Sequence, residues 1–223
     1  MKNGLVAAFE VQKVIPVIRA NSLGEARQIV TALYAGGVRV MELTTTIPDV
    51  YALVGEVRVQ RPDILVGLGT VCDRGMADQA VDSGADFLVT YKVSEAVADV
   101  GQRRRVPYVL GAATPTEVDR CMELDSAVVK IFPARIVGPN FIREIRGPIP
   151  EVRCFPTGGI GLDDIDKWLG AGSVAVGIGG ALIRLGSTNS DYSVVVQRAD
   201  SLLNQLGVDV EALTQVAARG RSS

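Results

Sequence analysis

A single lysine, Lys130, stands in the middle of the apolar run Ala127–Ala134. An apolar run of this length that ends in Pro-Ala is typical of a strand buried on both faces. Lysine is rarely buried unless it is paired or functional, because desolvation disfavours the ammonium form. Lys130 is therefore a candidate neutral amine and nucleophile near pH 7. The competing interpretation is a side chain at the strand end whose ammonium extends into water.

A glutamate, Glu42, interrupts a second apolar run. Side chains alternate along a strand, so Glu42 shares one face with Thr44, and Lys130 shares one face of its own strand with Phe132. Opposite charges that face inward from two strands suit a nucleophile beside a general acid or base. They also suit a structural ion pair, and the sequence leaves both interpretations open.

The absence of one residue type limits the remaining chemistry. The chain has no histidine, which excludes histidine-ligated zinc and Ser-His-Asp triads. Proton transfer then falls to carboxylates, lysine, tyrosine, cysteine or the substrate. The cysteines Cys72, Cys121 and Cys154 are odd in number and widely spaced. This pattern indicates reduced thiols in a cytoplasmic protein.

The charge balance argues against a nucleic-acid partner. The chain has 23 basic and 25 acidic residues, for a net charge of −2, and so predicts no basic binding surface. Its tight basic cluster, Arg103–Arg105, is expected to be a solvated helix end. The N-terminus lacks the apolar core of a signal peptide and no run reaches membrane-spanning length, so no membrane partner is expected.

The elements that position Lys130 and Glu42 follow from the alternation of β-branched runs with amphipathic helical patterns, the rhythm of repeated βα units. Capping-box spacings at Ser22–Glu25 and Thr114–Glu117 mark two helix starts. The runs that predict strands are Val14–Ala20, Val38–Thr45, Ile64–Val71, Asp86–Thr90, Val106–Ala112, Ala127–Phe132, Val152–Pro156 and Val174–Ile178.

Eight such units in one chain indicate an α/β protein with a single (β/α)8 TIM barrel over residues 1–206, including a short N-terminal helix. A doubly wound open sheet is the alternative, but it usually has a glycine-rich first turn, and Ile18–Ser22 lacks GxGxxG. Residues 207–223 are expected to be a C-terminal extension. In it we expect a short helix over Asp209–Ala218, and then a disordered end from Arg219 to Ser223.

Barrel enzymes place their sites at the carboxyl ends of the strands. Two glycine pairs stand at the last two of these ends, where many barrels bind phosphate through backbone N–H groups and a helix N-terminus. One pair alone is common at any tight turn, whereas both together favour a phosphate site. The polar and glycine residues at the strand ends are Arg19, Glu42, Thr44, Thr70, Thr90, Lys130, Thr157, Gly158, Gly159, Gly179 and Gly180.

Six phrases of the sequence occur in the order found in a known family. They are Pro16–Ser22, Gly36–Thr44, Gly67–Val71, Val129–Ala134, Val137–Phe141 and Phe155–Ile160. With them the chain resembles, over residues 13–206, the class I aldolases that cleave 2-keto-3-deoxy-6-phosphogluconate (KDPG), together with 4-hydroxy-2-oxoglutarate (KHG) aldolase.

The resemblance implies a (β/α)8 barrel that forms a homotrimer and uses no metal or other cofactor. It implies that Lys130 forms a Schiff base and that Glu42 is the general acid/base. The expected reaction is the reversible cleavage of KDPG, or of a related 4-hydroxy-2-oxo acid. The products are pyruvate and an aldehyde such as glyceraldehyde 3-phosphate or glyoxylate.

Substrate-binding roles follow from the same resemblance. Arg19 matches members that hold the substrate carboxylate from the end of the first strand. Thr70 and Thr44 are expected beside this carboxylate. Thr90 and Phe132 are expected to line the rest of the substrate pocket. The residues that would cradle a phosphate are Thr157, Gly158, Gly159, Gly179 and Gly180.

The chain departs from the best-known members at three positions. Thr46 stands where some members carry an arginine, Thr90-Tyr91 replaces a Ser-Pro, and Ala181 replaces a serine after the last glycine pair. Two other functions stay open for such a chain. One is a phosphate-binding isomerase or epimerase that transfers protons without an imine. The other is a non-catalytic ligand-binding relative of the aldolases.

Overall fold

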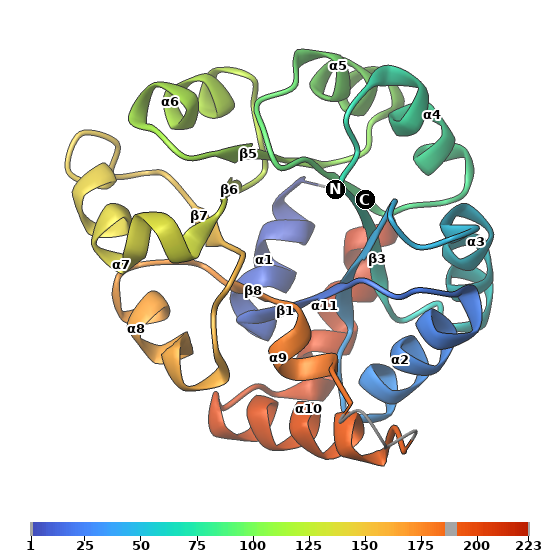
Figure 1. Cartoon of the computed structure of the whole chain (residues 1–223). Helices are drawn as coiled ribbons and strands as arrows, with labels where there is room; N and C mark the ends of the chain where they lie inside the picture. The colour runs from blue at the N-terminus through green and yellow to red at the C-terminus, as the bar shows by residue number, and fades with distance from the viewer. Residues whose placement is uncertain (1, 186–190, 223) are drawn as a thin grey trace.

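The structure is a computed structural model that describes residues 2–185 and 191–222. Its eight strands form one parallel sheet in the order β7-β6-β5-β4-β3-β2-β1-β8, and a bridge between Thr157 and Gly177 joins the two edge strands. The sheet is therefore a barrel with helices around it (Figure 1), as expected. The strands are β1 Val14–Ile18, β2 Val40–Thr44, β3 Leu65–Gly69, β4 Phe87–Val89, β5 Tyr108–Ala112, β6 Val129–Ile131, β7 Cys154–Pro156 and β8 Val176–Ile178.

Helices follow each strand, and two further helices come from the ends of the chain. Helix α7 contains a kink at Gly138, which has φ 74° and ψ 165°. The helices are α1 Lys2–Gln12, α2 Leu23–Ala35, α3 Val50–Gln60, α4 Arg74–Asp82, α5 Glu95–Arg104, α6 Pro115–Glu123, α7 Ala134–Ile145, α8 Ile165–Gly170, α9 Gly180–Ile183, α10 Ser193–Gln205 and α11 Val210–Ser222; a 3-10 turn, Leu162–Asp164, precedes α8.

All eight predicted strands are present, but each is shorter than its apolar run. In the sixth run, Ala127 and Val128 are 3% and 1% exposed although β6 begins at Val129. Apolar residues in a sequence indicate which positions are buried, but not which of them form hydrogen bonds between strands. The apolar run is therefore longer than the hydrogen-bonded strand.

The predicted capping boxes are confirmed. Ser22 accepts a hydrogen bond from the backbone N–H of Glu25 at 3.1 Å, and Thr114 accepts one from Glu117 at 3.3 Å. Each glutamate in turn accepts from the backbone just before the cap, at 2.8 Å from Asn21 and 2.9 Å from Ala113. These bonds satisfy N–H groups that have no partner inside the helix, and so fix where α2 and α6 leave the strand ends.

Helices α1 and α11 lie side by side behind the barrel (Figure 1). Helix α11 continues to Ser222, which differs from the disordered end expected from Arg219 onward; Ser223 lies outside the described residues. Leu213 and Ala217 of α11 are completely buried, and this packing supports a longer helix than the sequence alone indicated. Gln12, at the end of α1, donates to the carbonyls of Val14 and Val40 at 2.8 and 2.7 Å.

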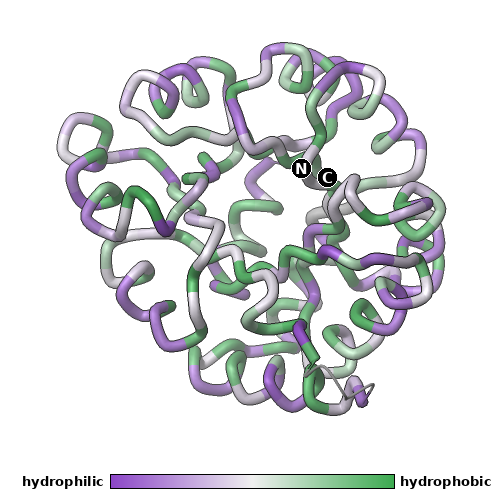
Figure 2. The backbone as a smooth tube through the Cα atoms, viewed as in Figure 1, coloured by the Kyte–Doolittle hydropathy of each residue, from purple (hydrophilic) through white to green (hydrophobic). Residues whose placement is uncertain are grey.

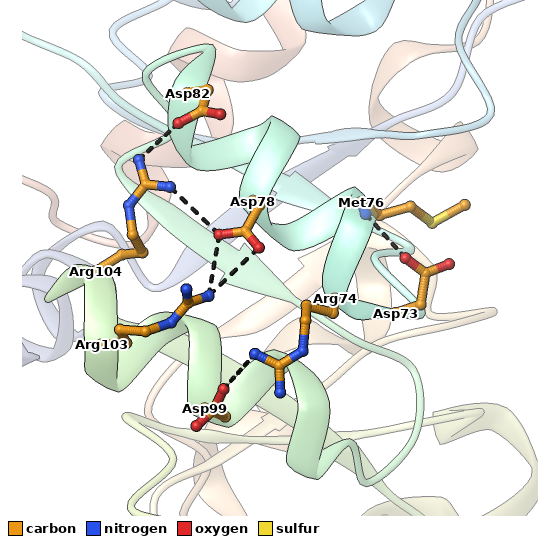
Figure 3. A network of polar contacts seen from close by, with 8 residues as sticks. All are labelled: Asp73, Arg74, Met76, Asp78, Asp82, Asp99, Arg103 and Arg104. Carbon is orange, nitrogen blue, oxygen red and sulfur yellow. Dashed lines mark hydrogen bonds and ion pairs between the residues drawn. The ribbon is translucent and has the colours of Figure 1, made fainter.

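The basic cluster lies on the outside of the barrel, in an ion-pair network between α4 and α5 (Figure 3). Arg103 and Arg104 both contact Asp78, at 3.2 and 3.3 Å, and Arg104 also contacts Asp82 at 2.6 Å. Two of its three arginines, Arg103 and Arg104, are thus paired with carboxylates at the helix end. Exposed pairs of this kind stabilise a fold by about 0–1 kcal/mol each.

Polar and apolar residues alternate around the outer helices (Figure 2), the pattern of helices that cover a sheet with one face. Among the residues that the structure describes, no helix combines the length and the apolarity that a membrane crossing requires.

Candidate active site

Lys130 and Glu42 meet inside the barrel, from β6 and β2. The Lys130 Nζ atom lies 3.0 Å from both carboxylate oxygens of Glu42. Their side chains are 6% and 1% exposed, so Lys130 does not extend its ammonium into bulk water. Because the two groups are in hydrogen-bond contact and shielded from water, a proton can pass between the Lys130 amine and the Glu42 carboxylate.

Three phenylalanines form an apolar floor beneath this pair. The Phe155 ring lies 5.9 Å from Lys130 Nζ, and Phe9 of α1 packs edge-on against Phe155 and Phe87 at 5.1 and 5.7 Å. All three rings are fully buried. The floor excludes water from one side of the pair and leaves the other side to a ligand.

Glycine at position 69 makes room for the carboxylate. A Cβ atom built on Gly69 would lie 1.9 Å from the Glu42 Oε1 atom, so the observed Glu42 conformation requires a residue without a side chain. A second such position is Gly177, where a Cβ atom would lie 2.2 Å from Thr157 Oγ1. Both glycines therefore position a functional group on the neighbouring strand.

A cavity of about 1270 Å³ opens at the carboxyl ends of the strands. It brings together most of the residues expected there. Glu42, Thr44 and Thr90 are not among its lining residues. The expected residues that line it are Arg19, Thr70, Lys130, Phe132, Thr157, Gly158, Gly159, Gly179 and Gly180.

Thr44 does not line the cavity, but it contacts residues that lie next to those that do. Its hydroxyl donates to the carbonyl of Ile18 at 2.9 Å and lies 2.7 Å from the Thr46 hydroxyl. Thr46 in turn accepts a hydrogen bond from Arg19 Nη1 at 3.3 Å. Thr44 thus acts on the position of Arg19 through Thr46, a residue that the sequence marked only as a departure.

Thr90 also makes its contacts with protein. Its hydroxyl donates to the carbonyl of Lys92 and accepts from the backbone N–H of Gly111 at 3.0 Å. A Cβ atom on Gly111 would lie 2.2 Å from the backbone of Tyr91. Thr90 and Gly111 therefore fix the path of the loop that carries Tyr91.

Thr70 lines the cavity with a left-handed backbone conformation, φ 62°. A non-glycine residue in this region costs on the order of 1 kcal/mol or more and persists where its surroundings hold it. Its carbonyl accepts hydrogen bonds from the Thr45 hydroxyl at 3.0 Å and the Cys72 thiol at 3.3 Å. These two donors hold Thr70 at the cavity wall.

Thr157 offers a free hydroxyl at the glycine-rich side. It is 4% exposed, lines the cavity, and its Oγ1 atom has no hydrogen-bond partner within the described parts of the chain. The next two residues, Gly158 and Gly159, have φ values of 105° and 77°, which favour glycine. This buried hydroxyl is therefore available to hydrogen-bond a polar ligand in the cavity.

Polar and charged residues that the sequence gave no binding role also line the cavity, among them Tyr91, Arg135 and Arg184. The Tyr91 ring lies 6.4 Å from that of Phe132, and a hydrogen bond with Cys72 raises the pKa of the Tyr91 hydroxyl. The two arginines follow the ends of β6 and β8 by a few residues. Their signal in the sequence is this position, a few residues past a strand end.

Two cysteines are poor competitors for the role of nucleophile. Burial raises the pKa of the Cys121 thiol and of the Cys154 thiol to about 12, so both stay protonated at neutral pH and thus unreactive. The Lys130 amine lines the cavity beside a carboxylate. This arrangement suits covalent chemistry on a carbonyl compound, with proton transfer by Glu42.

The comparisons with known proteins agree with this chemistry. A family model described as KDPG and KHG aldolase matches residues 6–198. The 2-dehydro-3-deoxy-phosphogluconate aldolase of Treponema pallidum is 31% identical over 203 residues, covering 90% of this chain and 97% of the relative. The KHG/KDPG aldolase of Escherichia coli is 31% identical over 169 residues, covering 75% and 79%.

A solved structure extends the likeness to three dimensions. The KDPG aldolase of Legionella pneumophila, with pyruvate captured as a covalent carbinolamine intermediate, has a TM-score of 0.82 and 28% identity. The match covers 88% of this chain and 97% of that one. The fold, the buried lysine and the family model lead to one conclusion: this chain belongs to the KDPG and KHG aldolase family.

Proposed function

We propose that the protein is a class I aldolase that reversibly cleaves KDPG, or a related 4-hydroxy-2-oxo acid, to pyruvate and an aldehyde. The observation that carries the proposal is the buried contact of Lys130 with Glu42, 3.0 Å apart at the base of a cavity large enough for a sugar acid. The covalent pyruvate adduct of the Legionella pneumophila aldolase supports the same chemistry.

The reaction begins with the amine of Lys130 in its neutral form, after its proton passes to Glu42. The amine attacks the C2 ketone to give a carbinolamine. Glu42 then gives its proton to the carbinolamine hydroxyl, which leaves as water, so that an iminium forms and Glu42 is again a carboxylate. Glu42 takes the proton of the C4 hydroxyl as the C3–C4 bond breaks, and the iminium accepts the electron pair. Glu42 then returns a proton to C3 of the enamine, and hydrolysis releases pyruvate.

The residues that line the cavity support binding roles for the rest of the substrate. Arg19 binds the carboxylate of the pyruvyl half with its guanidinium, a planar donor that matches a carboxylate. Thr70 lies beside it, and Phe132 contacts the carbon chain. Thr157 and the glycine pairs receive the far end of the aldehyde half.

Borohydride reduction in the presence of pyruvate tests the covalent route. Reduction of the imine should add one pyruvyl group to the intact protein, and peptide mapping should place it on Lys130. A sample reduced without pyruvate is the control. Absence of the adduct would rule out the imine mechanism and would favour an isomerase or epimerase that forms no imine.

Gly69→Ala should lower kcat for aldol cleavage roughly 100-fold, the scale for a catalytic group displaced by about 1 Å. The added methyl group would occupy the place of the Glu42 carboxylate, 1.9 Å from Oε1, so Glu42 must move. Steady-state kinetics measure the loss, and circular dichroism shows whether the barrel is intact. Gly24→Ala is the matched control, because its Cβ atom would come no closer than 4.0 Å to Ser22. Unchanged turnover in Gly69→Ala would show that the position of Glu42 is not critical.

We also propose that the protein forms a homotrimer in the cytoplasm. The family resemblance supports the trimer, and Ile136, an apolar side chain that is 79% exposed in the single chain, is the kind of residue that a subunit contact buries. Three cysteines without disulfide bonds support a reducing compartment. Light scattering on the purified protein tests the trimer, and a monomer mass would reject it.

A further inference from the structure

Two arginines approach the two glycine-rich turns of the cavity. Arg135, at the start of α7, lies against Gly159: its Nε atom donates to the Gly159 carbonyl at 3.5 Å, and lies 2.3 Å from where a Cβ atom on Gly159 would be. Arg184, just after α9, brings its guanidinium to 3.4 Å from the corresponding point on Gly180. Each turn of the proposed phosphate cradle therefore has a guanidinium beside it.

Neither guanidinium is neutralised by a carboxylate in the part of the chain that the structure describes. Surface arginines elsewhere do form such pairs, for example Arg27 with Glu56 at 2.9 Å. The one glutamate that lines the cavity, Glu25, accepts a hydrogen bond from the backbone of Asn21 at 2.8 Å. With Arg19 also present, the cavity favours an anionic ligand.

A phosphate group matches these donors. It carries a charge of about −1.5 to −2 at pH 7 and three strong acceptor oxygens, and arginine binds such groups through parallel hydrogen bonds. The hydroxyl of Thr157, buried and without a described partner, lies at the same side of the cavity. Ala181 gives no side-chain donor at the last turn, and Arg184 supplies charged donors three residues later.

We propose that Arg135 and Arg184 clamp the terminal phosphate of the aldehyde half and set the preference for phosphorylated substrates. The proposal rests on the proposed aldolase function. It assigns new residues to substrate binding, because both lie outside the six phrases that carry the family resemblance. The glycine turns shape the space, and the two guanidinium groups supply the charge that distinguishes a phosphate from a hydroxyl.

The test compares KDPG with its unphosphorylated analogue, 2-keto-3-deoxygluconate, in Arg135→Gln, Arg184→Gln and the double variant. Each single variant should lose roughly 10- to 100-fold in kcat/KM for KDPG, the scale of one charge-assisted interaction. Its kcat/KM for the unphosphorylated acid should change less than about 2-fold. Arg143→Gln is the matched control, since this exposed arginine of α7 contacts Asn140 at 2.7 Å and does not line the cavity.

Inorganic phosphate gives a second readout. It should inhibit the wild-type protein in competition with KDPG, and its inhibition constant should rise in the variants in step with the loss of kcat/KM. An unchanged preference for KDPG, or equal losses for both substrates, would overturn the clamp.

The borohydride trap separates this proposal from the proposed function. All variants should still form the pyruvyl adduct on Lys130. Without an adduct in the wild-type protein the aldolase function fails. An intact adduct combined with an unchanged phosphate preference rejects only the clamp.

Discussion

Lys130→Arg should lower aldol cleavage roughly 10⁴- to 10⁶-fold, the scale found when a covalent nucleophile is removed. A guanidinium stays protonated at every accessible pH and forms no imine with pyruvate. The substitution keeps a positive charge opposite Glu42, whereas an apolar replacement would leave a buried carboxylate unpaired. Turnover is measured with KDPG, and the borohydride adduct by intact mass.

A matched control for this substitution is Lys167→Arg. Lys167 is also paired with a carboxylate, Asp164, at 2.7 Å, but its side chain is 69% exposed on the outside of the barrel. We expect this variant to keep full activity and a normal adduct. A pyruvyl adduct that persists in Lys130→Arg would show that another amine forms the imine.

Glu42→Gln should lower turnover about 10²- to 10⁴-fold, the usual contribution of a general acid or base. Lys130 remains, so pyruvate should still be trapped by borohydride, whereas exchange of the pyruvate methyl protons with deuterated water should slow in proportion to turnover. This combination identifies proton transfer, and not imine formation, as the lost step.

The same variant reports on stability. Lys130 loses the carboxylate that it contacts at 3.0 Å, and breaking a buried pair from one side costs about 3–5 kcal/mol. Thermal unfolding should therefore begin at a lower temperature than in Glu56→Gln, which breaks only the surface pair with Arg27. A stability loss with normal turnover and normal exchange would mean that the pair is structural and that another group moves the proton.

The sequence predicted the barrel and its central pair because both depend on local pattern. A charge inside an apolar run is conspicuous, and the alternation of side chains shows which residues share its face of the strand. The order of the strands follows from repeated βα units, since each crossover sets the next strand beside the last.

The hydrogen-bond partners of individual hydroxyl groups could not be predicted from local pattern. Thr44 and Thr90 lie at the ends where the sequence placed them, but their hydrogen bonds depend on Ile18 and Lys92, which the fold brings near. The proposed binding roles of Arg135 and Arg184 depend on where α7 begins and where α9 ends relative to the glycine turns. Such positions are decided by packing and φ angles, which residue types alone do not determine.

The packing of α1 against α11 affects how the protein is made. The ribosome completes α1 before α11, and it adds about 5–20 residues per second. Synthesis of the roughly 200 residues between the two helices takes about 10–40 s at this rate, so α1 is without α11 for that time. During that time the side of α1 that α11 will cover is open to chaperones, and the nascent chain is exposed to aggregation at this helix.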